Sequence, residues 1–144
     1  MNKTIVSLAT VVVTAGSVPG LVALNATADA ATTSHTLKIR VTGLGGGHQT
    51  ESGFVSESRV TTLDNQFLGY EVDSGSIGPN GITDRIAIAL DGGILYFKTT
   101  VTETIEKGRV TGGSGRFAGA KGSIVSTSHD EQARTATYTI TWHK

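Results

Sequence analysis

The sequence predicts an all-β fold, a small antiparallel barrel of eight strands. Helical periodicity is almost absent after residue 30. Instead, short segments rich in Val, Ile, Thr, Tyr and Phe alternate with glycine or polar turns, which is typical of a sandwich or barrel. The turns are too tight for crossover helices, so neighbouring strands should be antiparallel. Closure into a barrel is the expected outcome because it removes the exposed sheet edges.

The first four predicted strands are residues 34–43, 54–63, 66–74 and 82–90. In the first, one face carries His35, Leu37, Ile39 and Val41. The glycine-rich stretch GLGGGHQT, residues 43–50, is expected to end that strand. Asp64-Asn65 and the loop IGPNG supply the next turns. In the fourth strand, one face carries Ile82, Asp84, Ile86, Ile88 and Leu90.

The last four predicted strands are residues 93–103, 103–112, 122–128 and 134–143. Asp91-Gly92-Gly93 is a strong hairpin signal before the first of them. In the final strand one face carries Arg134, Ala136, Tyr138, Ile140 and Trp142, and threonines alternate on the other.

Residues 1–30 have the order of an export signal. Lys3 is followed by a run without charge up to Ala28, and Ala28-Asp29-Ala30 is a small-residue cleavage site. The alternative is a retained membrane anchor, because the uncharged run is long enough to span a bilayer, although Gly, Pro, Ser and Thr dilute it. We therefore expect a secreted protein whose single barrel domain is residues 31–144, with no membrane association after cleavage.

The composition excludes several function classes. The chain has 12 basic and 12 acidic residues, so no basic field attracts nucleic acid or anionic lipid. Cysteine is absent, which excludes thiol nucleophiles and thiolate ligands. The four histidines, His35, His48, His129 and His143, are scattered without ligand spacing, so no metal site is expected. A serine hydrolase stays open, because serines are plentiful and Gly113-Ser114-Gly115 is half of a nucleophile elbow.

The stretch TGGSGRFAGAKG, residues 111–122, has five glycines and could either hold a phosphate or turn the chain. It matches the dinucleotide pattern G-x-G-x-x-A, but that site needs a helix directly after the glycines. KGSIVSTS follows instead, and it has strand character. The segment is therefore predicted to be a turn in which Gly115 adopts a conformation that β-branched residues resist. Phe117 should pack on the barrel wall, and Arg116 should reach solvent.

The same stretch resembles the GGTGxFxxARG motif of dirigent proteins and of bacterial allene oxide cyclase barrel-like proteins. The matching residues are Gly112, Gly113, Gly115, Phe117, Ala120 and Gly122. The resemblance covers about residues 36–144, and departs at Ser114 and at Lys121, where the family usually has Thr and Arg. Lys121 keeps the positive charge but lacks the planar fork of arginine.

This resemblance implies an eight-stranded barrel with a lumen, often in a homo-oligomer such as a trimer or a dimer. It also implies activity without a cofactor on a small apolar or phenolic ligand, whose cyclisation or coupling the protein steers. On this basis the protein is expected to be a cyclase or isomerase. A non-catalytic barrel that binds a small ligand or another surface is the alternative, since fold does not determine function.

The candidate site residues come from the strands. The expected catalytic residues are Asp73, Arg85 and Tyr70, and the expected ligand-binding residues are Tyr138, Lys121 and Glu57. Charged side chains that point into a lumen would form an acid–base set, whereas those that point outward would form a solvated face. For any one charged residue the outward orientation is favoured, because charged side chains are mostly exposed. The tyrosines could bind a ligand or only pack in the core.

Overall fold

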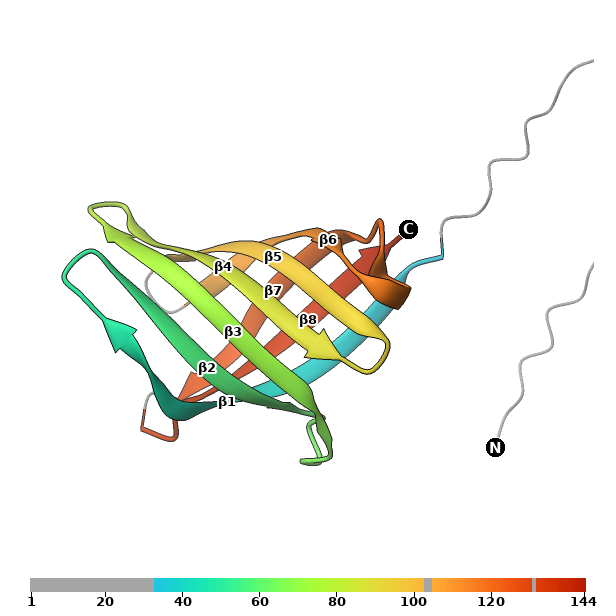
Figure 1. Ribbon diagram of the computed structural model, residues 1–144, viewed down its shortest axis with the longest axis horizontal. Helices are drawn as coiled ribbons and strands as arrows, with labels where there is room; N and C mark the ends of the chain where they lie inside the picture. Colours follow the sequence, from blue (N-terminus) through green and yellow to red (C-terminus); the bar gives the residue numbers. More distant parts are fainter. Residues whose placement is uncertain (1–32, 103–104, 131) are drawn as a thin grey trace, which may run out of the picture. The chain divides into compact units, whose positions relative to one another are not determined.

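The computed structural model describes residues 33–102, 105–130 and 132–144, so the predicted export signal lies outside the described residues. Each strand pairs antiparallel with the next, and β8 pairs with β1, so the sheet closes into a barrel (Figure 1). This confirms the predicted all-β, eight-stranded fold. The strands are β1 (His35–Gln49), β2 (Gly53–Thr61), β3 (Phe67–Gly78), β4 (Gly81–Leu90), β5 (Gly93–Thr102), β6 (Ile105–Gly113), β7 (Lys121–Asp130) and β8 (Thr135–His143).

The prediction that GLGGGHQT ends the first strand is wrong. β1 continues to Gln49 and pairs with β2 beyond the glycines, with a shift of register between Gly43 and Gly47. Gly45 and Gly47 have φ values of 78° and 132°, which glycine adopts without strain. The glycines therefore bend the strand through an irregularity and do not terminate it.

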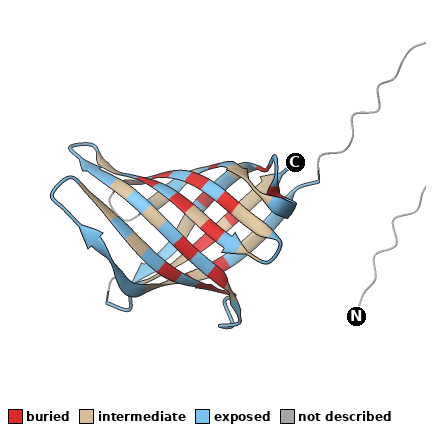
Figure 2. Ribbon diagram, in the orientation of Figure 1, coloured by how far each residue is buried: buried red, intermediate tan, exposed pale blue. Residues whose placement is uncertain are grey.

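Inward and outward residues alternate along the strands, which produces the chequered burial in Figure 2. One part of the lumen is filled by apolar side chains. The fully buried members of this core include Ile39, Val60, Ile88, Leu95, Ile124 and Ile140. The other part of the lumen is lined by polar side chains, which form the site described below.

A short 3-10 turn, η1 (Gly115–Phe117), contacts β5 and β6 at the apolar end of the barrel (Figure 1). Phe117 is 3% exposed, and its ring lies 5.8 Å from the ring of Trp142. The Arg116 backbone N–H donates to the Gly92 carbonyl at 2.8 Å, which ties the turn to the β4–β5 hairpin. The turn thus covers the core of the lumen at this end.

The glycine stretch is a turn between two strands, as predicted. Gly115 has φ 57°, and a Cβ there would overlap the Gly92 carbonyl oxygen. β7 follows directly, with no α-helix in between. Arg116 is exposed, as predicted, and its guanidinium also lies 4.8 Å above the Phe117 ring. No helix among the described residues is long and apolar enough to cross a membrane.

A candidate acid–base site in the barrel lumen

Four carboxyl groups and a tyrosine come together in the polar part of the lumen. Glu71 and Asp73 are two residues apart on β3, so the strand places both on its inner face. Asp84 faces inward from β4, where it lies opposite Gly75 of β3. Glu106 comes from β6 and Tyr138 from β8, and a hydrogen bond between their side chains joins the two strands across the lumen.

Hydroxyl groups donate to two of these four carboxyl groups. Glu106 accepts hydrogen bonds from the Tyr138 hydroxyl and from Thr99 Oγ1, the latter at 2.7 Å. Asp73 accepts a hydrogen bond from the Ser56 hydroxyl. Hydrogen bonds of this kind stabilise a carboxylate relative to the protonated acid. Glu106 and Asp73 are therefore held as hydrogen-bond acceptors.

The other two carboxyl groups are buried without such donors. Glu71 and Asp84 are each 4% exposed. Glu71 Oε2 and Asp84 Oδ1 have no hydrogen-bond partner among the described residues. A buried carboxyl oxygen without a partner is costly, especially when the group is charged. Each of these two atoms thus lacks, among the described residues, the hydrogen bond that would offset its burial.

Burial changes the acidity of these groups. It raises the pKa of Glu71 from 4.5 to about 8, and the negative charges of Asp73, Glu106 and Asp84 add to the shift. Burial, together with the charges of Glu106 and Asp73, raises the pKa of Asp84 from 3.8 to about 7. Glu71 is therefore mostly a neutral acid at neutral pH, and it can donate a proton.

The pKa values of Asp73 and Tyr138 are also raised. Burial raises the pKa of Asp73, and the Ser56 hydrogen bond partly offsets this effect. Burial and the nearby carboxylates raise the pKa of Tyr138, so its hydroxyl keeps its proton and donates to Glu106. The site therefore combines a neutral acid with carboxyl groups held as acceptors, an arrangement that can divide acid and base roles.

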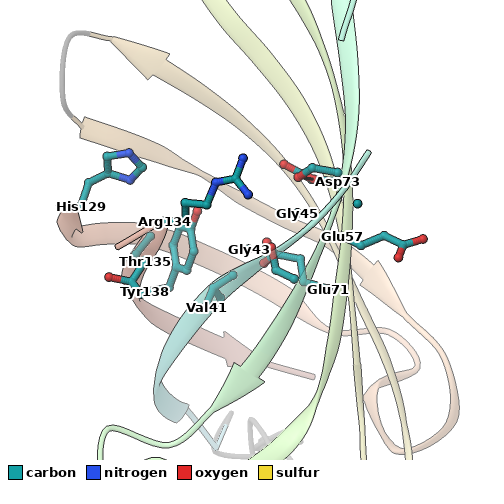
Figure 3. A pocket seen from close by; sticks show the side chains of 14 residues that line it. Val41, Gly43, Gly45, Glu57, Glu71, Asp73, His129, Arg134, Thr135 and Tyr138 are labelled. Carbon is teal, nitrogen blue, oxygen red and sulfur yellow. Dashed lines mark hydrogen bonds between the residues drawn. The ribbon is translucent and has the colours of Figure 1, made fainter. Parts of the chain in front are cut away.

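A cavity of about 310 Å³ opens onto this cluster. Figure 3 shows Asp73 and Arg134 projecting toward each other from opposite walls. The β1 glycines Gly43, Gly45 and Gly46 form part of the lining, as do Val41, Ser56, Ser58, Glu71, His129, Ala136 and Tyr138. Ligand pockets of small molecules begin at about this size.

The six predicted site residues do not all lie together: two are in the lumen and four are exposed. Asp73 and Tyr138 lie in the lumen, on the same cavity. Tyr70 is 55% exposed and Arg85 is exposed, because each precedes or follows an inward residue and alternation turns it outward. Neither residue lines the lumen cavity, although Arg85 borders a second pocket together with Asp73, and a catalytic role for Tyr70 and Arg85 stays a prediction.

Lys121 is also exposed, and it borders a shallow surface pocket with Arg109 and Gly122. Glu57 is exposed and borders the lumen cavity, but its side chain extends away from the interior in Figure 3. The general expectation that each charged side chain points outward is wrong for Glu71 and Asp84.

Sequence analysis did not select Glu71, Asp84, Glu106 or Arg134 as site residues. A signal existed for Asp84, which shares a strand face with Ile86 and Ile88, both buried. No comparable signal existed for Glu106, because its partners Thr99 and Tyr138 lie on other strands. In the described part of the chain, no group of three or more His, Cys, Asp or Glu side chains has an arrangement suited to a metal ion.

Comparisons of sequence give no match, either among protein-family models or among curated proteins. Comparison of structures does give matches. Pyocyanin demethylase superposes with a TM-score of 0.62 at 17% identity, over 75% of this chain and 99% of that chain.

Two pterocarpan synthase dirigent proteins also match. GePTS1 has a TM-score of 0.60 at 16% identity, over 78% of this chain and 88% of its own. PsPTS1 has a TM-score of 0.53 at 14% identity, over 78% of this chain and 94% of its own. The chain thus shares its eight-stranded barrel fold with dirigent proteins and with pyocyanin demethylase.

Proposed function

We propose that the protein binds a small, largely apolar molecule in its lumen and catalyses the cyclisation or isomerisation of that molecule by proton transfer. The observation that carries this proposal is Glu71. This residue is 4% exposed and lines the cavity, and its Oε2 has no hydrogen-bond partner in the part of the chain that the structure describes. Because the pKa of Glu71 is raised to about 8, the group holds a proton at neutral pH.

The proposed reaction uses only the side chains of the lumen. Glu71 donates its proton to an oxygen or an unsaturated carbon of the ligand, which leaves positive charge on the ligand. The carboxyl group of Asp73, on the same strand face and the same cavity, stabilises that charge. The ring closes or the double bond moves, and a proton returns from the ligand to Glu71. The sequence is redox-neutral and needs no co-reactant or cofactor.

Two further observations support a small ligand in the lumen. The apolar core fills one part of the barrel, so the cavity is limited to about 310 Å³. The structural neighbours include a demethylase and two synthases by name. At identities of 14–17% these names support an enzyme only by analogy of fold.

A non-catalytic ligand-binding barrel is the second candidate. The observation that favours it is the dense apolar packing of Leu95, Ile140 and their neighbours, which leaves the cavity shallow. In that case Glu71, which lines the cavity, would only form a hydrogen bond with the ligand. The two candidates differ in whether the bound molecule is converted.

The test is a screen of dialysed, chelator-treated protein against epoxide, polyene and phenolic substrates, with product analysis by chromatography and mass spectrometry. A converted substrate should then be assayed with Glu71→Gln, which keeps the shape of the side chain but cannot donate an acidic proton. We expect the rate to fall by about 10²–10⁴-fold. Glu51→Gln, at an exposed position that does not line the cavity, is the control and should keep the wild-type rate.

The results separate the candidates. The rate should fall as the pH rises past about 8, where Glu71 loses its proton. A Glu71→Gln protein with the wild-type rate would rule out the proposed acid. Saturable binding in the cavity without conversion of any substrate would support the non-catalytic alternative.

We also propose that the protein is exported and that cleavage follows Ala30. The support is the small-residue site Ala28-Asp29-Ala30 behind an uncharged run. Intact mass and N-terminal sequencing of protein from the culture medium should give Ala31 as the first residue. Recovery of the full-length chain in the membrane fraction would instead indicate a retained anchor.

A further inference from the structure

Arg134 stands at the mouth of the lumen cavity in a constrained backbone conformation. Its φ is 52°, one of two positive values among the described non-glycine residues. A positive φ costs a non-glycine residue free energy and persists only where surrounding contacts hold it. One such contact is the Arg134 carbonyl, which accepts a hydrogen bond from the Gly43 backbone N–H at 2.9 Å.

The glycine bend of β1 accommodates the Arg134 side chain. A Cβ on Gly45 would lie 3.2 Å from Arg134 Nη1, and a Cβ on Gly43 would lie 3.5 Å from Arg134 Cβ. A side chain at position 45 would therefore crowd the guanidinium group, whereas Gly45 leaves room for it beside the cavity.

The position of Arg134 relative to the other groups indicates its role. Arg134 is exposed and directly precedes β8, and it lines the cavity together with Ala136 and Tyr138 of that strand. In Figure 3 the guanidinium projects into the opening, across from Asp73. Glu71 and Asp73 line the same cavity. A guanidinium placed in this way can bind a planar anionic group through two parallel hydrogen bonds.

We propose that Arg134 determines ligand specificity by binding an anionic oxygen group of the ligand at the cavity mouth. This inference rests on the proposed function and names its substrate class, an apolar molecule that carries a carboxylate, sulfonate or phenolate group. The apolar body of the ligand would lie along Val41 and Ala136. Its reactive part would then reach Glu71, which is neutral at neutral pH and does not repel the anion.

The experiment compares two fluorescent probes with the same aromatic body. One is 1-anilinonaphthalene-8-sulfonate, which is an anion, and the other is N-phenyl-1-naphthylamine, which is neutral. Dissociation constants are measured for the wild type, Arg134→Gln and Arg134→Lys. Arg85→Gln is the control, since it removes the same charge from the outer face of β4. Ala136→Trp, which fills the cavity, should abolish binding of both probes, with folding checked by circular dichroism.

We expect Arg134→Gln to weaken binding of the sulfonate by about tenfold or more, because a charge-assisted hydrogen bond is lost. The neutral probe should change by less than about twofold. Arg134→Lys should lie between the wild type and Arg134→Gln, because lysine keeps the charge but not the fork. Arg85→Gln should match the wild type.

Three outcomes would overturn the inference. If the neutral probe binds in the cavity, and Arg134→Gln affects both probes equally or affects neither, the role of Arg134 is refuted. The proposed function would still stand in that case. A loss of sulfonate binding in Arg85→Gln would place the anion on the outer face. Absence of cavity binding for both probes would count against this inference and against the proposed lumen ligand.

Discussion

The Tyr138 hydroxyl donates a hydrogen bond to Glu106 Oε2, and this contact joins β8 to β6 across the lumen. Thr99 of β5 donates to the other oxygen of the same carboxyl group. Both oxygens of Glu106 are therefore satisfied, whereas Glu71 and Asp84 each have one oxygen without a partner among the described residues. The distribution of three hydroxyl donors, Ser56, Thr99 and Tyr138, thus decides which carboxyl groups accept a hydrogen bond from a side-chain hydroxyl.

Tyr138→Phe should lower stability. The variant leaves Glu106 Oε2 without its donor in a half-buried position, which costs about 1–3 kcal/mol of unfolding free energy. Urea unfolding followed by fluorescence would measure the change. Tyr70→Phe is the matched control, because Tyr70 is 55% exposed, and it should change stability by less than about 0.5 kcal/mol. Equal effects of the two substitutions would contradict the importance of the Tyr138–Glu106 contact.

The stability of the wild type should fall as the pH rises from about 5 to about 9. The pKa of Glu71 is about 8 in the folded protein and near 4.5 when the chain is unfolded. Between these values the folded state binds more protons than the unfolded state, so raising the pH favours unfolding. The pKa of Asp84, about 7, acts in the same direction.

The midpoints of urea unfolding at a series of pH values would measure how steeply the stability falls with pH, that is, the slope of stability against pH. Glu71→Gln should flatten it and should be more stable than the wild type at the alkaline end, since no charge is buried there. Glu57→Gln should keep the wild-type slope. A Glu71→Gln protein with the full wild-type slope would show that Glu71 does not titrate as proposed.

Gly115→Val should destabilise the barrel more than Gly119→Val does. Both glycines have positive φ, 57° and 80°, so each substitution introduces backbone strain of roughly 1–3 kcal/mol. Only at Gly115 would the new Cβ also overlap the Gly92 carbonyl oxygen, because nothing lies within 4 Å of a Cβ on Gly119. Thermal unfolding of both variants would measure the difference. Equal melting temperatures would mean that the close approach to Gly92 is relieved without cost.

Gly75→Ala, on β3, should displace the side chain of Asp84 on the neighbouring strand β4. A Cβ at this position would overlap Asp84 Oδ1 and the ring of Phe54, so the two side chains would have to move. Overpacking of this kind costs about 1–3 kcal/mol. Gly78→Ala, on the same strand, is the control, since its nearest contact would be 3.8 Å away. Unfolding midpoints that are the same for both variants would show that Asp84 has room to move.

The sequence by itself determined the all-β class, the number of strands and most of the turns. Alternation of apolar residues is a local property, so the sequence could show that Ile86 and Ile88 share one strand face and that Tyr138 and Ile140 share another. Which of the two faces of each strand lines the lumen could not be identified in this way. The tight turn at Gly115 was also predictable, because it depends on a conformation that only glycine adopts readily.

Only the tertiary structure decided which polar residues form the site. A strand has two faces, and whether the face of Glu71 and Asp73 or that of Tyr70 and Val72 points inward depends on how the whole sheet closes. Glu106 became part of the site through contacts with Thr99 and Tyr138, which come from other strands. The raised pKa of Glu71 likewise arises from burial and from charges that only closure of the barrel brings together.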